Sequence, residues 1–124
     1  MILVDTSVWV DHLRAGDTTL AGLLHAGMVL VHPFVIGELA LGNLRQRALV
    51  LGALSDLPQA SVATDAEVRR FIESHALFGR GIGYLDAHLL AAARLTAGAQ
   101  VWTRDQRLHG VADRLGLAAT LPKQ

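Results

Sequence analysis

The sequence predicts an α/β protein, arranged as a three-layer α/β/α sandwich around a short, mainly parallel sheet of about five strands. Two observations lead to this prediction. The short apolar segments are apolar at every position rather than at alternate positions, as expected of strands that are buried on both faces. Segments with helical character, bounded by capping residues and glycines, lie between these strands. Strands that are joined through helices are typical of a parallel sheet with both sides covered.

The expected elements alternate along the whole chain. The five expected strands are residues 2–4, 28–31, 60–63, 100–102 and 117–119. The expected helices are 6–14, 18–26, 33–41, 44–54, one that begins after Thr64, 84–97 and 104–115. Pro33 is typical of a first helical turn and Gly42 of a residue that ends a helix. Thr64 and Glu67 have the spacing of a capping box, and three glycines in residues 79–83 indicate a loop.

Composition limits the class of protein. A chain of 124 residues and 13.2 kDa is expected to form a single domain over residues 1–124. Apolar residues make up 52% and charged residues 18%, which excludes intrinsic disorder, and the absence of cysteine excludes disulfides. The mean hydropathy of +0.37 is high, so we expect another subunit or a partner to cover part of the surface. No membrane span or signal peptide is recognisable, so a cytoplasmic protein is expected.

Two aspartates follow predicted parallel strands. Asp5 comes directly after strand 2–4, and Asp105 lies three residues beyond the end of strand 100–102. Ligands bind to open α/β sheets at the carboxyl ends of the strands, so both side chains are expected in one crevice. Each aspartate also has a purely structural interpretation as the cap of the helix that follows it.

Two further acids lie on predicted helices. Glu38 has Phe34 four residues before it and Leu41 three residues after it, so we expect it on a buried apolar stripe. A buried carboxylate must be paired or protonated, so Glu38 is expected to face either a metal ion or an arginine. Asp86 lies in the first turn of helix 84–97, where the helix dipole offers a simpler explanation.

All four acids can reach one crevice; they are Asp5, Glu38, Asp86 and Asp105. Oxygen ligands without histidine or cysteine suit Mg²⁺ or Mn²⁺, which bind phosphate oxygens and activate water. The net charge is zero, so charge alone does not indicate nucleic-acid binding. With the four acids committed to a metal, 11 basic residues face 7 acidic ones, and the resulting +4 is compatible with a phosphodiester substrate.

The order and spacing of these motifs resemble those of the PIN domain. The resemblance covers Met1 to about Leu117, and its motifs are Asp5-Thr6-Ser7 after a strand, Glu38 in an early helix, Tyr84-Leu85-Asp86 opening a late helix, and Thr103-Arg104-Asp105 after a strand. Among PIN domains, the chain is most similar to the VapC-type ribonuclease toxins of prokaryotic toxin–antitoxin modules.

This resemblance implies a site and an activity. The implied catalytic, metal-binding acids are Asp5, Glu38, Asp86 and Asp105, and the implied supporting hydroxyls are those of Thr6 and Thr103. The implied activity is endoribonucleolytic hydrolysis by a metal-activated water, dependent on Mg²⁺ or Mn²⁺. The implied partners are a second copy of the chain and a VapB-like antitoxin that blocks the site. Some relatives carry another acid just after the last aspartate; this chain has Gln106 and Arg107 there, which leaves one and two metal ions both open.

Other residues have weaker signals. Arg80, within the glycine loop, and Arg104 are candidate contacts for RNA phosphates, although the loop is equally compatible with a plain connection. His88 is expected to point away from the aspartate two residues before it, without a catalytic role. Trp9 and Trp102 are expected in the core or at a dimer surface rather than as base-stacking platforms.

Three other functions also place an aspartate at a strand end. A haloacid-dehalogenase-type phosphatase requires a second aspartate two residues after Asp5, where this chain has Ser7. A receiver-like module has no use for Glu38 and requires a lysine near the last strand, whereas the one lysine is Lys123. A catalytically silent PIN-like binding module leaves the complete acid set without a purpose.

Overall fold

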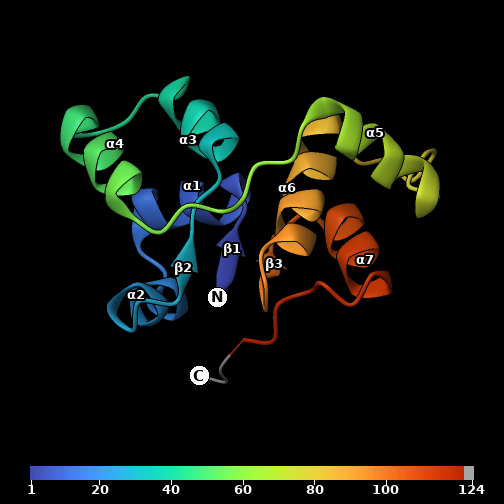
Figure 1. Cartoon of the computed structure of the whole chain (residues 1–124). Coiled ribbons are helices and arrows are strands. Elements are labelled where there is room, and N and C mark those ends of the chain that lie inside the picture. The colour runs from blue at the N-terminus through green and yellow to red at the C-terminus, as the bar shows by residue number, and fades with distance from the viewer. Residues whose placement is uncertain (122–124) are drawn as a thin grey trace.

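The computed structural model describes residues 1–121, which contain three strands and seven helices (Figure 1). The strands are β1 (Ile2–Val4), β2 (Val29–Leu30) and β3 (Gln100–Trp102). The helices are α1 (Thr6–Ala15), α2 (Thr18–His25), α3 (Pro33–Ala40), α4 (Arg47–Asp56), α5 (Asp65–Ser74), α6 (Tyr84–Leu95) and α7 (Gln106–Arg114). The expected alternation of strands and helices is therefore present.

The sheet is parallel, with the strand order β2-β1-β3. Leu3 lies opposite Leu30 on one side and Val101 on the other, so β1 is the central strand. In Figure 1, β2 leads from α2 at the bottom to α3 at the top, so the carboxyl ends of the strands lie at the top. Because the strands are parallel, the residues that follow them meet at this one end.

The α/β architecture is confirmed, but the expected count of five strands is wrong: three form in the described residues. Segments 60–63 and 117–119 are not strands, and their neighbourhoods contribute one bridge each, Val31 with Gln59 and Val101 with Ala118. The chain crosses from α4 to α5 directly after the first bridge, as the green segment in Figure 1 shows, so no ladder can extend. Ala60 and Ala63 are buried, so packing alone explains the apolar pattern there.

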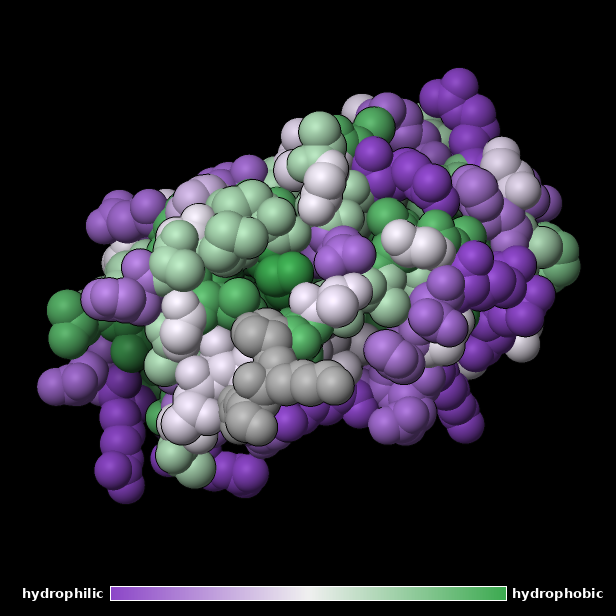
Figure 2. All heavy atoms as spheres, turned by 90° about the horizontal axis from the view of Figure 1, so that it is seen from below, coloured by the Kyte–Doolittle hydropathy of each residue, from purple (hydrophilic) through white to green (hydrophobic). Residues whose placement is uncertain are grey.

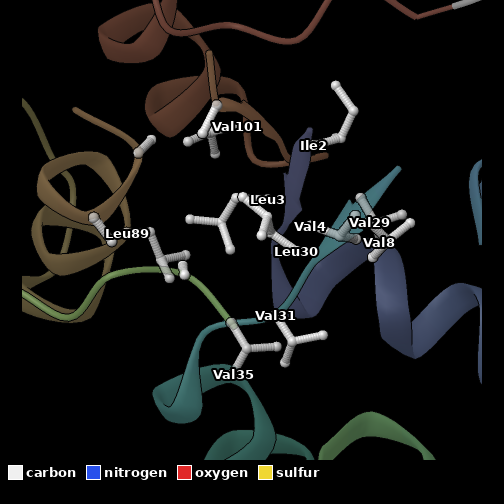
Figure 3. Packing of buried hydrophobic residues seen from close by; sticks show 14 of the residues in the cluster. Ile2, Leu3, Val4, Val8, Val29, Leu30, Val31, Val35, Leu89 and Val101 are labelled. Carbon is white, nitrogen blue, oxygen red and sulfur yellow. The ribbon is translucent and has the colours of Figure 1, made fainter. Parts of the chain in front are cut away.

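The sheet is covered on both faces. Leu3 and Val4 are completely buried in the central strand. Figure 3 shows Leu89 of α6 and Val8 of α1 approaching β1 from opposite sides. This two-sided packing is the physical reason why β1 and β2 are apolar at every position, and it gives the residue after β1 a rigid support.

Local signals determine several helix starts. The capping box is present: the Thr64 hydroxyl accepts from the Glu67 amide at 3.1 Å, and the Glu67 carboxylate accepts from the Thr64 amide at 2.9 Å. The helix expected over residues 44–54 begins later, at Arg47, because Gln46 adopts a left-handed conformation with φ of 51°. The helix expected over residues 84–97 ends at Leu95.

The surface differs between the two sides of the molecule. Seen from the amino ends of the strands, apolar residues lie across the middle, and hydrophilic residues gather on the side of α5 and α7 (Figure 2).

Among residues 1–121, no helix combines the length and the apolar character that crossing a bilayer requires.

Candidate active site

Asp5 is held rigidly at the carboxyl end of the central strand. Its amide donates to the Trp102 carbonyl at 2.9 Å, which extends the pairing of β1 with β3 by one residue. The side chain is 7% exposed, and its Oδ2 accepts from the hydroxyls of Ser7 at 2.8 Å and Thr103 at 2.7 Å. Although Asp5 stands at the N-cap position of α1, its carboxylate makes no capping bond. The capping interpretation therefore fails for Asp5, and its Oδ1 accepts no hydrogen bond from the described residues.

Asp105 combines a structural role with a free oxygen. It is the N-cap of α7, and its Oδ1 accepts from the amides of Arg107 at 2.9 Å and Leu108 at 3.1 Å. Its own amide donates to the Thr103 hydroxyl at 3.0 Å. The capping interpretation is thus correct for one oxygen, while Oδ2 receives no hydrogen bond from residues 1–121.

Glu38 corrects the expectation of burial. On α3 the buried residues are Val35 and Leu39, whereas Glu38 is exposed. The neighbours that defined the expected stripe are themselves exposed, Phe34 by 37% and Leu41 by 91%. The apolar spacing therefore predicted the wrong face of this two-turn helix as the buried one.

The Glu38 carboxylate is nevertheless positioned. The Thr6 hydroxyl donates to its Oε1 at 2.6 Å, which joins the first turn of α1 to α3. Glu38 is therefore held beside the residue that follows Asp5 by a hydrogen bond to a neighbouring helix rather than by burial. Its Oε2 has no hydrogen-bond donor among the described residues.

Asp86 is the acid on which the charges of the other three act. It lies half-buried in the first turn of α6, and its Oδ2 accepts from the Gly83 amide at 3.0 Å. Burial raises the pKa of the Asp86 carboxyl; the Gly83 hydrogen bond opposes this shift, and three nearby charges add to it, those of Asp5, Asp105 and Glu38. The charges of these three acids therefore act on Asp86.

These four carboxylates, which we call the acid cluster, share one arrangement. Each uses one oxygen for a positioning hydrogen bond and keeps the other without a donor from the described residues. Within residues 1–121, no basic side chain forms an ion pair with any of them. An uncompensated cluster of this kind favours a cation as ligand.

The acid cluster fits a hard divalent cation. Among the described residues, no three acidic or histidine side chains lie close enough together to hold a metal ion among them. Mg²⁺ keeps several of its waters and binds through one or two carboxylates, so an open arrangement of single oxygens suits it. The donor set is composed of oxygen alone, which is the chemistry that Mg²⁺ and Mn²⁺ prefer.

Ser7 is a site residue that the sequence interpretation missed. Its hydroxyl donates to Asp5 Oδ2, accepts from the Arg104 amide at 3.0 Å and lies 3.3 Å from the Thr103 hydroxyl. It therefore connects the ends of β1 and β3. Its position two residues after Asp5, in the first turn of the following helix, is the sequence signal that could have indicated this role.

The two arginines expected to contact RNA phosphates lie outside the acid cluster. Arg80 is exposed, and its Nε donates to the Ala76 carbonyl. Arg104 pairs through Nε with Asp11 at 2.9 Å and through Nη2 with Asp17 at 2.5 Å. Neither guanidinium forms an ion pair with the four acids.

Histidines connect the helices that carry Glu38 and Asp86. His88 is buried on α6, and its Nε2 lies 3.1 Å from Asp65 Oδ1, so it takes no part in the acid cluster. Its ring lies edge-on to those of Phe34 and Tyr84, with centroids 4.8 Å apart in both pairs.

His32, also buried, caps α3 by accepting from the Phe34 amide. Trp9 is buried in the core, as expected.

Fold and site together define an α/β protein with an acidic site at the carboxyl ends of parallel strands. The family model of the PIN domain matches residues 2–114, and the chain belongs to the PIN domain family. This membership excludes the phosphatase and receiver-like interpretations of the strand-end aspartate.

Individual relatives agree with this assignment. The chain is 49% identical over 118 residues to Ribonuclease VapC32 from two strains of Mycobacterium tuberculosis, an alignment that covers 95% of each chain. The crystal structure of the M. tuberculosis toxin VapC20, described as cleaving the sarcin-ricin loop, is similar in fold with a TM-score of 0.67 and 23% identity, over 98% of this chain and 100% of that one. The crystal structure of FitAcB from Neisseria gonorrhoeae is similar with a TM-score of 0.62 and 23% identity, over 91% and 94%.

Proposed function

We propose that this protein is a ribonuclease that hydrolyses RNA phosphodiester bonds with the help of Mg²⁺ or Mn²⁺. The observation that carries the proposal is the acid cluster: four carboxylates, each with a free oxygen, and no basic partner among the described residues. The relative that is 49% identical is named a ribonuclease, which supports RNA as the substrate.

In this proposal the cation is held by the acid cluster, that is, by Asp5, Glu38, Asp86 and Asp105. A bound ion would supply activation of a water for attack on the phosphorus and stabilisation of the oxygen that leaves. The chain itself supplies orientation. Thr103 and Ser7 both donate to Asp5 Oδ2, which keeps Oδ1 available to a ligand, and Thr6 fixes Glu38 in the same way.

Arg80 is proposed as a contact for the RNA backbone. It is exposed and forms no ion pair with an acid in residues 1–121, so its charge is available to a phosphate. Replacing a phosphate contact is expected to weaken binding at all RNA sequences alike and to lower the salt dependence of binding by about one counterion.

We also infer that the protein acts in the cytoplasm, as a single domain, as the toxin of a toxin–antitoxin module. The kinship with a VapC ribonuclease supports a VapB-like antitoxin as partner. A homodimer is proposed because several large apolar side chains are strongly exposed, above all Leu41, Leu49 and Phe78. Light scattering of the purified protein at micromolar concentration tests the dimer, and a monomer would contradict it.

The decisive experiment measures RNA cleavage by the purified, antitoxin-free protein. We expect cleavage with Mg²⁺ or Mn²⁺, none in excess EDTA, and recovery when the metal is restored. Asp86→Asn is expected to lose cleavage, whereas Asp113→Asn, which removes an exposed acid of α7, is the matched control and keeps it.

Two results would contradict the proposal. Full activity in EDTA would exclude the metal-dependent mechanism. Specific RNA binding without cleavage, at millimolar Mg²⁺ and Mn²⁺, would instead identify a catalytically silent PIN-like binding module.

A further inference from the structure

Arg104 lies between two site residues, but its side chain extends to a different part of the molecule. Thr103 before it binds Asp5, and Asp105 after it belongs to the acid cluster. The guanidinium reaches Asp11 of α1 with Nε and Asp17, before α2, with Nη2. Its central carbon also lies 5.8 Å from the centre of the Trp102 ring. The guanidinium is thus already paired with two aspartates, which conflicts with the expectation that it contacts RNA.

Segment 103–105 is fastened on both of its sides. The inner side is held by hydroxyls, since the Thr103 hydroxyl donates to Asp5 Oδ2 and the Arg104 amide donates to the Ser7 hydroxyl at 3.0 Å. The outer side is held by the Arg104 guanidinium through its two aspartates, while Asp105 caps α7. Removal of the guanidinium would leave the segment anchored by these hydroxyl bonds and by the Asp105 cap of α7.

The aspartate that receives Arg104 is itself fixed. Asp17 is the N-cap of α2, and its Oδ1 accepts from the Leu20 amide at 2.9 Å, which leaves Oδ2 for Arg104. The Leu20 hydrogen bond and the Arg104 guanidinium hold the pKa of Asp17 below its usual range. A planar guanidinium that bridges two carboxylates defines a direction as well as a charge, which a lysine cannot reproduce.

The arrangement contributes more to geometry than to stability. The Arg104 side chain is 42% exposed, that of Asp11 is 40% exposed and that of Asp17 is 18% exposed, and ion pairs that solvent reaches contribute little to the free energy of unfolding. Groups that orient the ligands of a metal, by contrast, change metal affinity strongly when they are removed.

We propose that Arg104 is a positioning residue, which uses Asp11 and Asp17 to hold Thr103 and Asp105 in the geometry that binds the metal. The inference rests on the proposed metal-dependent function. It replaces the role of Arg104 as an RNA-phosphate contact.

The first test measures Mn²⁺ binding by calorimetry, without RNA. Arg104→Gln is expected to weaken Mn²⁺ binding about threefold to tenfold, somewhat below the range known for direct partners of metal ligands. Arg104→Lys is expected to restore only part of the affinity. The double variant Asp11→Asn/Asp17→Asn is expected to match Arg104→Gln, and combining all three changes is expected to weaken binding no further, because all act on one network.

The second test separates positioning from RNA contact. For Arg104→Gln we expect a lower kcat at subsaturating Mn²⁺, an unchanged KM for RNA and an unchanged salt dependence of KM. A raised KM with a salt slope reduced by about one would show a phosphate contact and overturn the proposal. Unchanged Mn²⁺ affinity in a folded Arg104→Gln protein would overturn it as well, and a lower melting temperature without an affinity change would show a purely structural role.

The wild type and Asp86→Asn distinguish failure of this inference from failure of the proposed function. If the wild type binds Mn²⁺ and Asp86→Asn does not, the metal site exists, and the Arg104 variants decide the inference alone. If the wild type binds no Mn²⁺, the proposed function itself is wrong.

Discussion

Two groups of acidic residues differ in whether basic side chains pair with their carboxylates. Asp11 and Asp17, at the α1–α2 corner, both pair with Arg104, and Asp17 also caps a helix. The acid cluster has no basic partner in residues 1–121, and Asp86 is further disfavoured as an anion by burial. The chain has eleven basic residues, so the difference arises from where these residues lie and not from their number. Negative charge that is left uncompensated in this way is a feature of a site rather than of a scaffold.

The largest difference is expected for cleavage of RNA. Asp5→Asn keeps the size of the side chain but removes the charge that the cation needs, so cleavage is expected to fall by about 10²–10³-fold, since metal stabilisation is worth several kcal/mol. The measurement is a single-turnover cleavage rate at saturating Mn²⁺, with Asp113→Asn as the control. An Asp5→Asn rate within a factor of ten of the wild type would remove Asp5 from the proposed site.

A buried histidine next to the site predicts a pH effect on stability. Burial, aided by the nearby His88, lowers the pKa of His32 to about 4, whereas the unfolded chain keeps about 6.5. Between these values the unfolded state binds more protons, so the stability contributed by His32 is present above pH 6.5 and is lost as the pH falls toward 4.

The size of this loss is roughly 2–3 kcal/mol. His32→Asn keeps an N-cap acceptor for the Phe34 amide but does not titrate. Urea unfolding at pH 7.5 and pH 4.5 is expected to show a smaller loss for the variant than for the wild type. Equal losses in the two proteins would show that His32 does not cause the effect.

The acid cluster is also expected to respond to metal in the absence of RNA. Binding to the folded state alone stabilises it by about 1.4 kcal/mol when the metal concentration is ten times Kd, which corresponds to a rise of about 5 °C in Tm. We expect this rise for the wild type and for Asp113→Asn, and a smaller one for Asp86→Asn. Thermal unfolding with EDTA and with Mg²⁺ measures it; identical shifts in all three proteins would indicate binding elsewhere.

The smallest effects concern single charges in metal-free protein, and they have opposite signs. Asp86→Asn is expected to raise the free energy of unfolding in EDTA at neutral pH. The pKa of Asp86 is raised in the folded state, so its contribution to stability falls as the pH rises through the carboxylate range and the side chain ionises. The asparagine does not ionise and avoids this loss. Asp17→Asn is expected to lower the free energy of unfolding by about 0.5 kcal/mol, since it weakens an exposed ion pair but keeps a cap. The same sign for both variants would contradict the contrast between the two groups.

Features that depend on neighbouring residues followed from the sequence. The capping box of Thr64 and Glu67 formed as predicted because both partners lie within one helical turn. The three strands formed at three of the predicted apolar segments, and parallel pairing then placed Asp5 and Asp105 at the same end of the sheet. These are consequences of local spacing and of one general rule about parallel sheets.

Other features were decided by contacts between distant residues. The burial of Glu38 was predicted wrongly because its helix has only two turns, and packing against the core selected Val35 and Leu39. The bond from Thr103 to Asp5 joins residues 98 positions apart, and Arg104 reaches Asp17 over 87 positions. Spacing along a helix or strand carries no information on such pairs, because the direction of a side chain at a loop depends on which element folds beside it. The sequence by itself determined which acids lie at the ends of the strands; the tertiary structure decided which acids were left unpaired.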